Sequence, residues 1–116
     1  MTTPILSGDM WCVNFNSADL TACEEVKAAV AGQSHYIHYL VVFLLSTTTF
    51  TLGAGETTPG APDTKILGAV PFSSSGGSPL IVDLRDNPII LTAGKSLVAL
   101  TTNAVSITIL VIGKTA

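Results

Sequence analysis

The two histidines of this 116-residue chain, His35 and His38, are the first candidates for metal binding or acid–base chemistry. Their separation of three residues places them on opposite faces of a β-strand, so one strand cannot direct both toward the same metal ion. A site shared between subunits would still need a third ligand, and the neighbouring sequence offers none. We expect polar residues at the start of a strand, with no metal and no other cofactor.

The densest group of charges is Asp-Leu-Arg-Asp-Asn-Pro at residues 83–88. Two carboxylates flank Arg85 and could together hold a cation or a sugar. A turn with local ion pairs is the commoner cause of such a cluster, and we expect a turn.

The serine-rich residues 73–78 have the composition of a phosphate-binding loop, but the lysine and the following helix of such a loop are missing. No serine has a histidine and an acid in an order that suggests a catalytic triad. We therefore expect a protein that is not an enzyme.

Composition suggests a surface that partners cover. Charged residues make up 11% of the chain, against about 25% in a typical soluble domain. The longest apolar run, Leu40–Leu45, is far shorter than the ~18 residues of a spanning helix, so we expect no membrane partner. A net charge of −3 with scattered lysines and arginines also predicts no nucleic-acid partner. Assembly with other protein subunits remains the best explanation.

The elements that must position these residues are β-strands, most clearly in Pro79–Gly113. Val105, Ile107, Ile109 and Val111 alternate with Ser106 and Thr108, which is the period of a half-buried strand. Leu110 and Ile112 break the alternation, so the end of this strand is expected to be covered on both faces. Tight turns at residues 93–95 and 102–104 predict an antiparallel meander.

The longest regular segment is His35–Leu52, with apolar residues on both faces. The alternation places Ile37, Tyr39, Val41, Phe43 and Leu45 on one face, and His38, Leu40, Val42 and Leu44 on the other. This pattern predicts a central strand packed on two sides, or one face used between subunits. The expected core includes Ile37, Val41, Phe43, Leu97, Ile107, Ile109 and Val111.

Two points stay open. Residues 20–31 have a capping Asp19 and helical spacing, but a strand followed by a turn fits as well and is favoured. Cys12 and Cys23 could pair, although two reduced, buried thiols are the expectation.

Residues 1–19 form an expected N-terminal arm, and residues 20–116 a single domain. A short strand over Trp11–Phe15 is compatible with the arm, which either packs on its own domain or lies on a neighbour. Seven or eight strands in such a domain are typical of an all-β antiparallel sandwich or jelly roll.

Three segments carry a resemblance to a family: Val26–Leu45, the short run Leu67–Pro71, and Asn87–Val111. Their order of apolar strands and Gly/Ser turns resembles small β-jelly-roll virion proteins of tailed bacteriophages, over roughly residues 21–114. The resemblance implies a capsid-decorating or other head-associated protein, commonly a homotrimer, without catalytic residues.

We therefore expect a structural protein made in the host cytoplasm that binds the outer capsid surface of a virion. Its partners would be the major capsid protein and two further copies of itself. The capsid-binding residues expected in the arm are Ile5, Leu6, Met10, Trp11, Val13 and Phe15. The residues expected at the subunit interface are Tyr39, Val41, Phe43, Ile109 and Val111. A receptor- or carbohydrate-binding jelly-roll module on the virion is the alternative.

Overall fold

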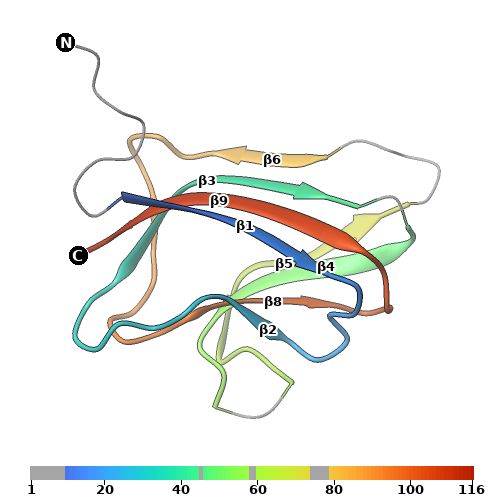
Figure 1. The fold of residues 1–116 in the computed structure, drawn as a ribbon, viewed down its shortest axis with the longest axis horizontal. Helices are drawn as coiled ribbons and strands as arrows, with labels where there is room; N and C mark the ends of the chain where they lie inside the picture. Colours follow the sequence, from blue (N-terminus) through green and yellow to red (C-terminus); the bar gives the residue numbers. More distant parts are fainter. Residues whose placement is uncertain (1–9, 45, 58–59, 74–78) are drawn as a thin grey trace.

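The structure is a computed structural model that describes residues 10–44, 46–57, 60–73 and 79–116. In this part of the chain every regular element is a strand, and two antiparallel sheets pack as a β-sandwich (Figure 1). The prediction of an all-β sandwich is confirmed. None of the described residues form a helix long and apolar enough to cross a membrane.

The first sheet has the order β1 (Met10–Ser17), β9 (Ile107–Thr115), β3 (His35–Phe43) and β6 (Leu80–Asp83). The short β7 (Ile89–Ile90) pairs with β3 along the same edge as β6. The second sheet has the order β2 (Glu24–Lys27), β8 (Leu97–Thr101), β4 (Thr48–Ala54) and β5 (Thr64–Phe72).

Strands far apart in the sequence pair in a nested pattern. β1 pairs with β9, β2 with β8, β3 with β6, and β4 with β5, all antiparallel. Contacts of β9 with β3 and of β8 with β4 complete the two sheets. The first and third of these pairs lie in the first sheet, and the second and fourth lie in the second sheet. The chain therefore resembles one long hairpin folded over into two layers.

The predicted meander over residues 79–113 is wrong because β8 and β9 lie in different sheets. The turn itself is where the sequence placed it, at Gly94, whose φ of +78° favours glycine. A glycine turn can join two strands of one sheet as a hairpin, or two strands of different sheets as an arch. The turn residues alone therefore do not distinguish a hairpin from an arch.

The core lies between the sheets and is built from alternating residues of their inner faces. Ile37, Leu97, Ile107, Ile109 and Val111 are buried, as predicted. Phe50, which is fully buried on β4, contacts Phe72 edge to face at 6.5 Å between ring centroids.

Val41 and Phe43 were predicted to be core residues, and this is wrong. The register of β3 against β9 shifts after Ile37, which lies opposite Gly113, whereas Tyr39 lies opposite Ile112. His38 is the additional residue of this β-bulge, and the residue parity of the inner face changes there. The inward residues after the bulge are Leu40, Val42 and Leu44, and the outward ones are Tyr39, Val41 and Phe43.

Residues 10–17 of the expected N-terminal arm pack on the domain itself, which is one of the two placements expected for the arm. These residues form β1, which pairs residue for residue with β9. Trp11, Val13 and Phe15 pack against the domain's own core, so they do not form a free arm that awaits a partner. Ile5 and Leu6 lie outside the described residues.

A partly buried series of hydrogen bonds joins β1 to β9 and β3. The Nε1–H of Trp11 donates to the Thr115 hydroxyl oxygen at 2.8 Å, and that hydroxyl lies 2.8 Å from Nδ1 of His35. His35 is fully buried, and its Nε2 lies 2.8 Å from the carbonyl oxygen of Ala28, which can only accept. In a neutral ring Nε2 therefore carries the hydrogen, and Nδ1 accepts from the Thr115 hydroxyl.

Residues 20–31 contain the strand β2 at Glu24–Lys27 and no helix, so the favoured interpretation is confirmed. Leu20, Cys23 and Val26 are buried. Both cysteines are free, but Cys12 is exposed, so the prediction of two buried thiols holds only for Cys23.

Candidate functional site

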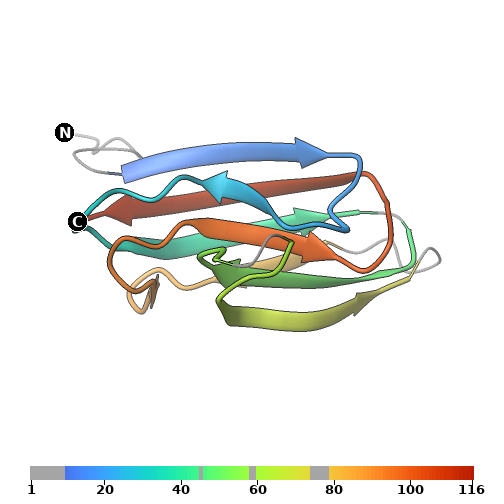
Figure 2. The same cartoon turned by 90° about the horizontal axis from the view of Figure 1, so that it is seen from below.

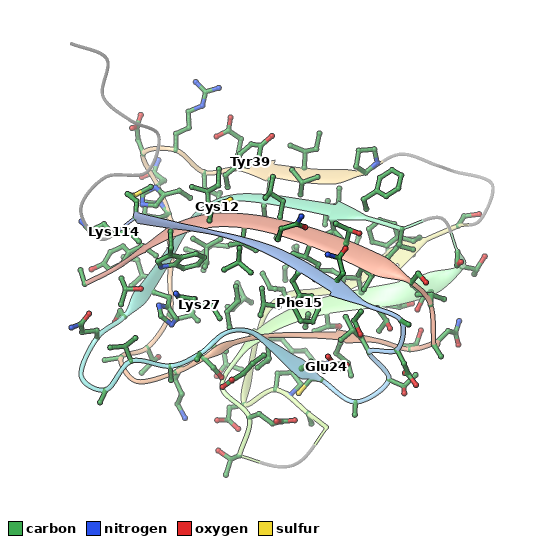
Figure 3. The ribbon with its side chains drawn as sticks, viewed as in Figure 1. Cys12, Phe15, Glu24, Lys27, Tyr39 and Lys114 are labelled. Atoms are coloured by element: carbon green, nitrogen blue, oxygen red, sulfur yellow. The ribbon has the colours of Figure 1, made fainter. Side chains whose placement is uncertain are left out.

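The outer face of the first sheet carries apolar side chains that the second sheet does not cover. They are Tyr39, Val41 and Phe43 on β3, Leu110 and Ile112 on β9, and Ile81 on β6, and together we call them the apolar face. In the sheet, Val41 lies between Leu110 and Ile81, and Tyr39 lies between Ile112 and Asp83. Figure 3 shows Tyr39 on the side of this sheet away from β2.

Few charges interrupt the apolar face. Its border on β1 consists of the exposed residues Cys12, Asn14 and Asn16, which are uncharged, and its border on β6 includes Asp83. The strands are ~4.8 Å apart and same-face residues ~6.7 Å apart, so the six residues of the apolar face cover about 200 Å². The largest apolar patch on a typical monomer, about 300–600 Å², is often functional, and the apolar face approaches this size.

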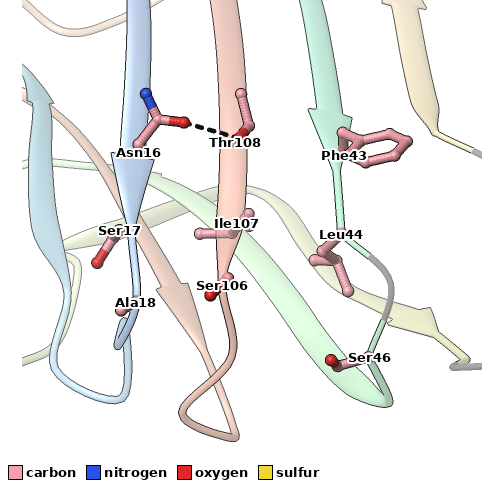
Figure 4. Close-up of a pocket in the computed structure, with 9 residues that line it drawn as sticks. All are labelled: Asn16, Ser17, Ala18, Phe43, Leu44, Ser46, Ser106, Ile107 and Thr108. Atoms are coloured by element: carbon pink, nitrogen blue, oxygen red, sulfur yellow. Dashed lines mark hydrogen bonds between the residues drawn. The ribbon is translucent and has the colours of Figure 1, made fainter.

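A shallow hollow of about 510 Å³ opens at the Phe43 end of the apolar face (Figure 4). Its polar side chains come from β1, β9 and the connecting segments, and the Thr108 hydroxyl donates to Oδ1 of Asn16 at 2.7 Å. The lining residues are Asn16, Ser17, Ala18, Phe43, Leu44, Ser46, Ser106, Ile107 and Thr108. Because none of them is ionisable, this Asn16 hollow suits a neutral ligand with hydroxyl groups better than an ion.

The structure separates the residues predicted for the subunit interface. Tyr39, Val41 and Phe43 lie together on the apolar face, whereas Ile109 and Val111 are fully buried in the core. An interface role for Ile109 and Val111 is therefore wrong. Their neighbours Leu110 and Ile112 occupy the outer face instead. The sequence indicated an apolar outer face at the end of β9, because residues on both sides of the strand are apolar there.

Of the residues predicted to bind the capsid, Met10, Trp11, Val13 and Phe15 all lie in β1. Phe15 extends toward the second sheet, on the side opposite Cys12 (Figure 3).

Local sequence motifs do not indicate the Asn16 hollow because its polar residues come from distant segments.

The charge cluster of residues 83–88 forms a turn, as predicted. Arg85 Nε donates to Oδ2 of Asp83 at 2.9 Å, and the backbone N–H of Asn87 donates to the carbonyl oxygen of Leu84. The Arg85 side chain is 84% exposed, so this ion pair contributes little to stability. No group of three or more metal-ligating side chains occurs within the described ranges.

The buried thiol of Cys23 donates to Oε2 of Glu56 at 2.9 Å. Burial, with the hydrogen bond and charge of Glu56, raises the pKa of the Cys23 thiol to about 12. The same hydrogen bond and the backbone N–H of Gly60 lower the pKa of Glu56. A thiol held in its protonated form is a poor nucleophile, so this pair fastens the loop after β4 and does not form a reactive centre.

No protein-family model, no curated protein and no solved structure matches this chain. The fold and the surface define an antiparallel β-sandwich with one largely uncharged apolar face.

Proposed function

We propose that the sandwich is a jelly roll. If the two-residue β7 is set aside, the described residues form eight strands, and their nested antiparallel pairs alternate between two four-stranded sheets. A long hairpin wound into two sheets in this way gives the two Greek keys of a jelly roll. The strand order thus supports a jelly roll as the particular type of β-sandwich.

The protein acts, on this proposal, as a non-enzymatic structural protein of a phage virion. It assembles as a homotrimer and binds the outer capsid surface, with the major capsid protein as its partner. The apolar face is the observation that carries the proposal, because Phe43 and Ile81 leave 45% and 57% of their surfaces in water. The resemblance to head-associated jelly-roll proteins supplies the virion context.

The size of the apolar face favours attachment through several copies. Covering about 200 Å² at about 25 cal/mol/Å² gives roughly 5 kcal/mol before association costs of about 4–15 kcal/mol are subtracted. A single copy therefore gains little net free energy, while copies joined in one particle gain affinity through avidity. Weak contacts of single copies that add up in a larger particle are compatible with a decoration protein.

The test is to replace Phe43 with aspartate, which places a charge within a contact that excludes water. Light scattering should show loss of the trimer, and the variant should no longer co-sediment with undecorated capsids. Val30→Asp is the matched control, since Val30 is also an exposed apolar residue, 38% exposed, in the segment after β2 and away from the apolar face. Wild-type assembly and attachment of a folded Phe43→Asp variant would disprove the proposal.

The Asn16 hollow supports one alternative, a carbohydrate-binding module on the virion. The hollow combines the exposed Phe43 ring with several hydroxyl groups and with the amide of Asn16, which lies on the other side of Thr108. A sugar offers an apolar face and hydroxyl groups together, so it suits this lining. Glycan binding that is lost in Asn16→Ala, with no attachment to capsids, would favour this alternative.

A further inference from the structure

Three of the four sheet edges carry features that discourage pairing with another strand. β2 has four residues and a register shift against β8. β5 contains Pro71 and is irregular against β4. On the third edge, β6 is short and is separated from β7 by a turn that contains Pro88. Short, bulged and proline-containing edges protect natural sheets from further strands.

The fourth edge, β1, has none of these features. Its eight residues pair with β9 without a register shift, and its sequence MWCVNFNS contains neither proline nor a charged residue. β1 is the outermost strand along one side of the molecule (Figure 2). Within the described ranges no strand pairs with its outer edge, and no turn or loop backbone bonds to it. Alternate N–H and C=O groups of β1 therefore point away from the sandwich.

Side chains along the same edge are incompletely covered. Trp11, Val13 and Phe15 pack on the core but remain partly exposed at the rim of the sandwich. An added strand would bury more of this apolar surface and also satisfy the free backbone groups. Two independent observations, one of the backbone and one of the side chains, thus favour a strand as the occupant.

We propose that β1 pairs antiparallel with β1 of a second copy of this chain about a two-fold axis. A second copy fits because an uncharged strand places no like charges opposite each other when it pairs with itself. In the combined sheet, the inner faces of both copies must lie on the same side. Each residue of β1 therefore lies opposite a residue of the second copy whose side chain points to the same face. If Asn14 lies on the two-fold axis, residues 11–17 of one copy pair with the same residues of the second copy. If Val13 lies on the axis, the paired residues are 10–16 of both copies.

This contact goes beyond the proposed function and does not depend on it. The edge of β1 lies in the plane of the first sheet, whereas the apolar face points along its normal, so both surfaces can be occupied together. If the apolar face forms trimers, pairing through β1 links neighbouring trimers by a two-fold contact.

Disulfide trapping in a Cys12→Ser background tests the pairing. Across a two-fold axis, opposite Cβ atoms are about 4.5–5.5 Å apart, which is close enough for a disulfide after a small adjustment. Under mild oxidation either Asn14→Cys or Val13→Cys should form covalent dimers at least tenfold faster than the exposed turn variant Asn87→Cys. The position that reacts identifies the residue on the axis.

A second measurement uses charge. Asn14→Lys in the otherwise natural chain places two lysines close together across the two-fold contact, and sedimentation equilibrium should show at least a tenfold weaker association than for Asn87→Lys. Phe43→Asp should leave the disulfide trapping unchanged, so failure of the apolar face and failure of the β1 contact are distinguishable. Trapping of Asn14→Cys and Val13→Cys no faster than Asn87→Cys, or unchanged association in a folded Asn14→Lys variant, would overturn the proposal.

Discussion

Replacing Thr115 with valine should loosen β1 from the sandwich while leaving its shape almost unchanged. The Thr115 hydroxyl accepts from Nε1–H of Trp11 and contacts Nδ1 of His35, both at 2.8 Å. Valine has nearly the same shape as threonine but can replace neither hydrogen bond. His35 is fully buried, so water cannot substitute for the missing partner.

The expected loss of stability follows from these two contacts. Leaving a buried polar group without a partner costs about 1–3 kcal/mol, and losing a partly buried hydrogen bond costs about 0.5–1.5 kcal/mol. Thr115→Val should therefore lower the free energy of unfolding by about 2–4 kcal/mol, a large share of the roughly 5–15 kcal/mol of a typical domain.

Urea unfolding followed by tryptophan fluorescence measures this change directly, because Trp11 is the only tryptophan and lies in β1. Thr115→Ser is the control, since it keeps the hydroxyl and removes only a methyl group. A valine variant as stable as the natural protein, or a serine variant as unstable as the valine variant, would refute the role of this hydrogen-bonded chain.

Four further predictions address the core, the two faces of β9, the pH dependence of stability and the reactivity of the two thiols. Phe50→Ala should lower the free energy of unfolding by about 3–5 kcal/mol in urea titrations, because a fully buried aromatic ring leaves a cavity. Val111→Asp should prevent folding, whereas Leu110→Asp should fold with a strand-type circular dichroism spectrum and lose only the self-association through the apolar face. The folded-state pKa of Cys23, about 12, exceeds the ordinary 9.0, so the unfolded state loses this proton first. Stability should therefore fall as pH rises from 9 toward 12, and less steeply in Cys23→Ala; equal slopes would contradict this. At pH 8, an alkylating reagent should modify exposed Cys12 and spare Cys23 in the folded protein.

The position of β1 in the first sheet also determines the effect of removing residues 10–17. A free arm could be removed without harm to the domain, but residues 10–17 supply an edge strand and part of the core cover. Their alternation of apolar and polar residues was compatible with a strand. Only the unpaired edge of β9, created by the fold of residues far along the chain, determines where that strand binds.

The sequence by itself determined the class of the fold and the position of several turns. Alternating β-branched and aromatic residues specify strands wherever they occur, and glycines at positions 32 and 94 permit the positive φ of the turns there. It also marked the end of β9 as apolar on both sides, which identified the strand that contributes Leu110 and Ile112 to the apolar face.

Only the tertiary structure decided which residues face the core and which face outward in β3. A strand pattern fixes the relative facing of neighbouring residues, but one inserted residue reverses it for the rest of the strand. The bulge at His38 arises from the register of β3 against β9, where Ile37 lies opposite Gly113 and Tyr39 opposite Ile112. That register is a property of two segments far apart in the chain, so local periodicity could not assign Tyr39, Val41 and Phe43 to the outer face.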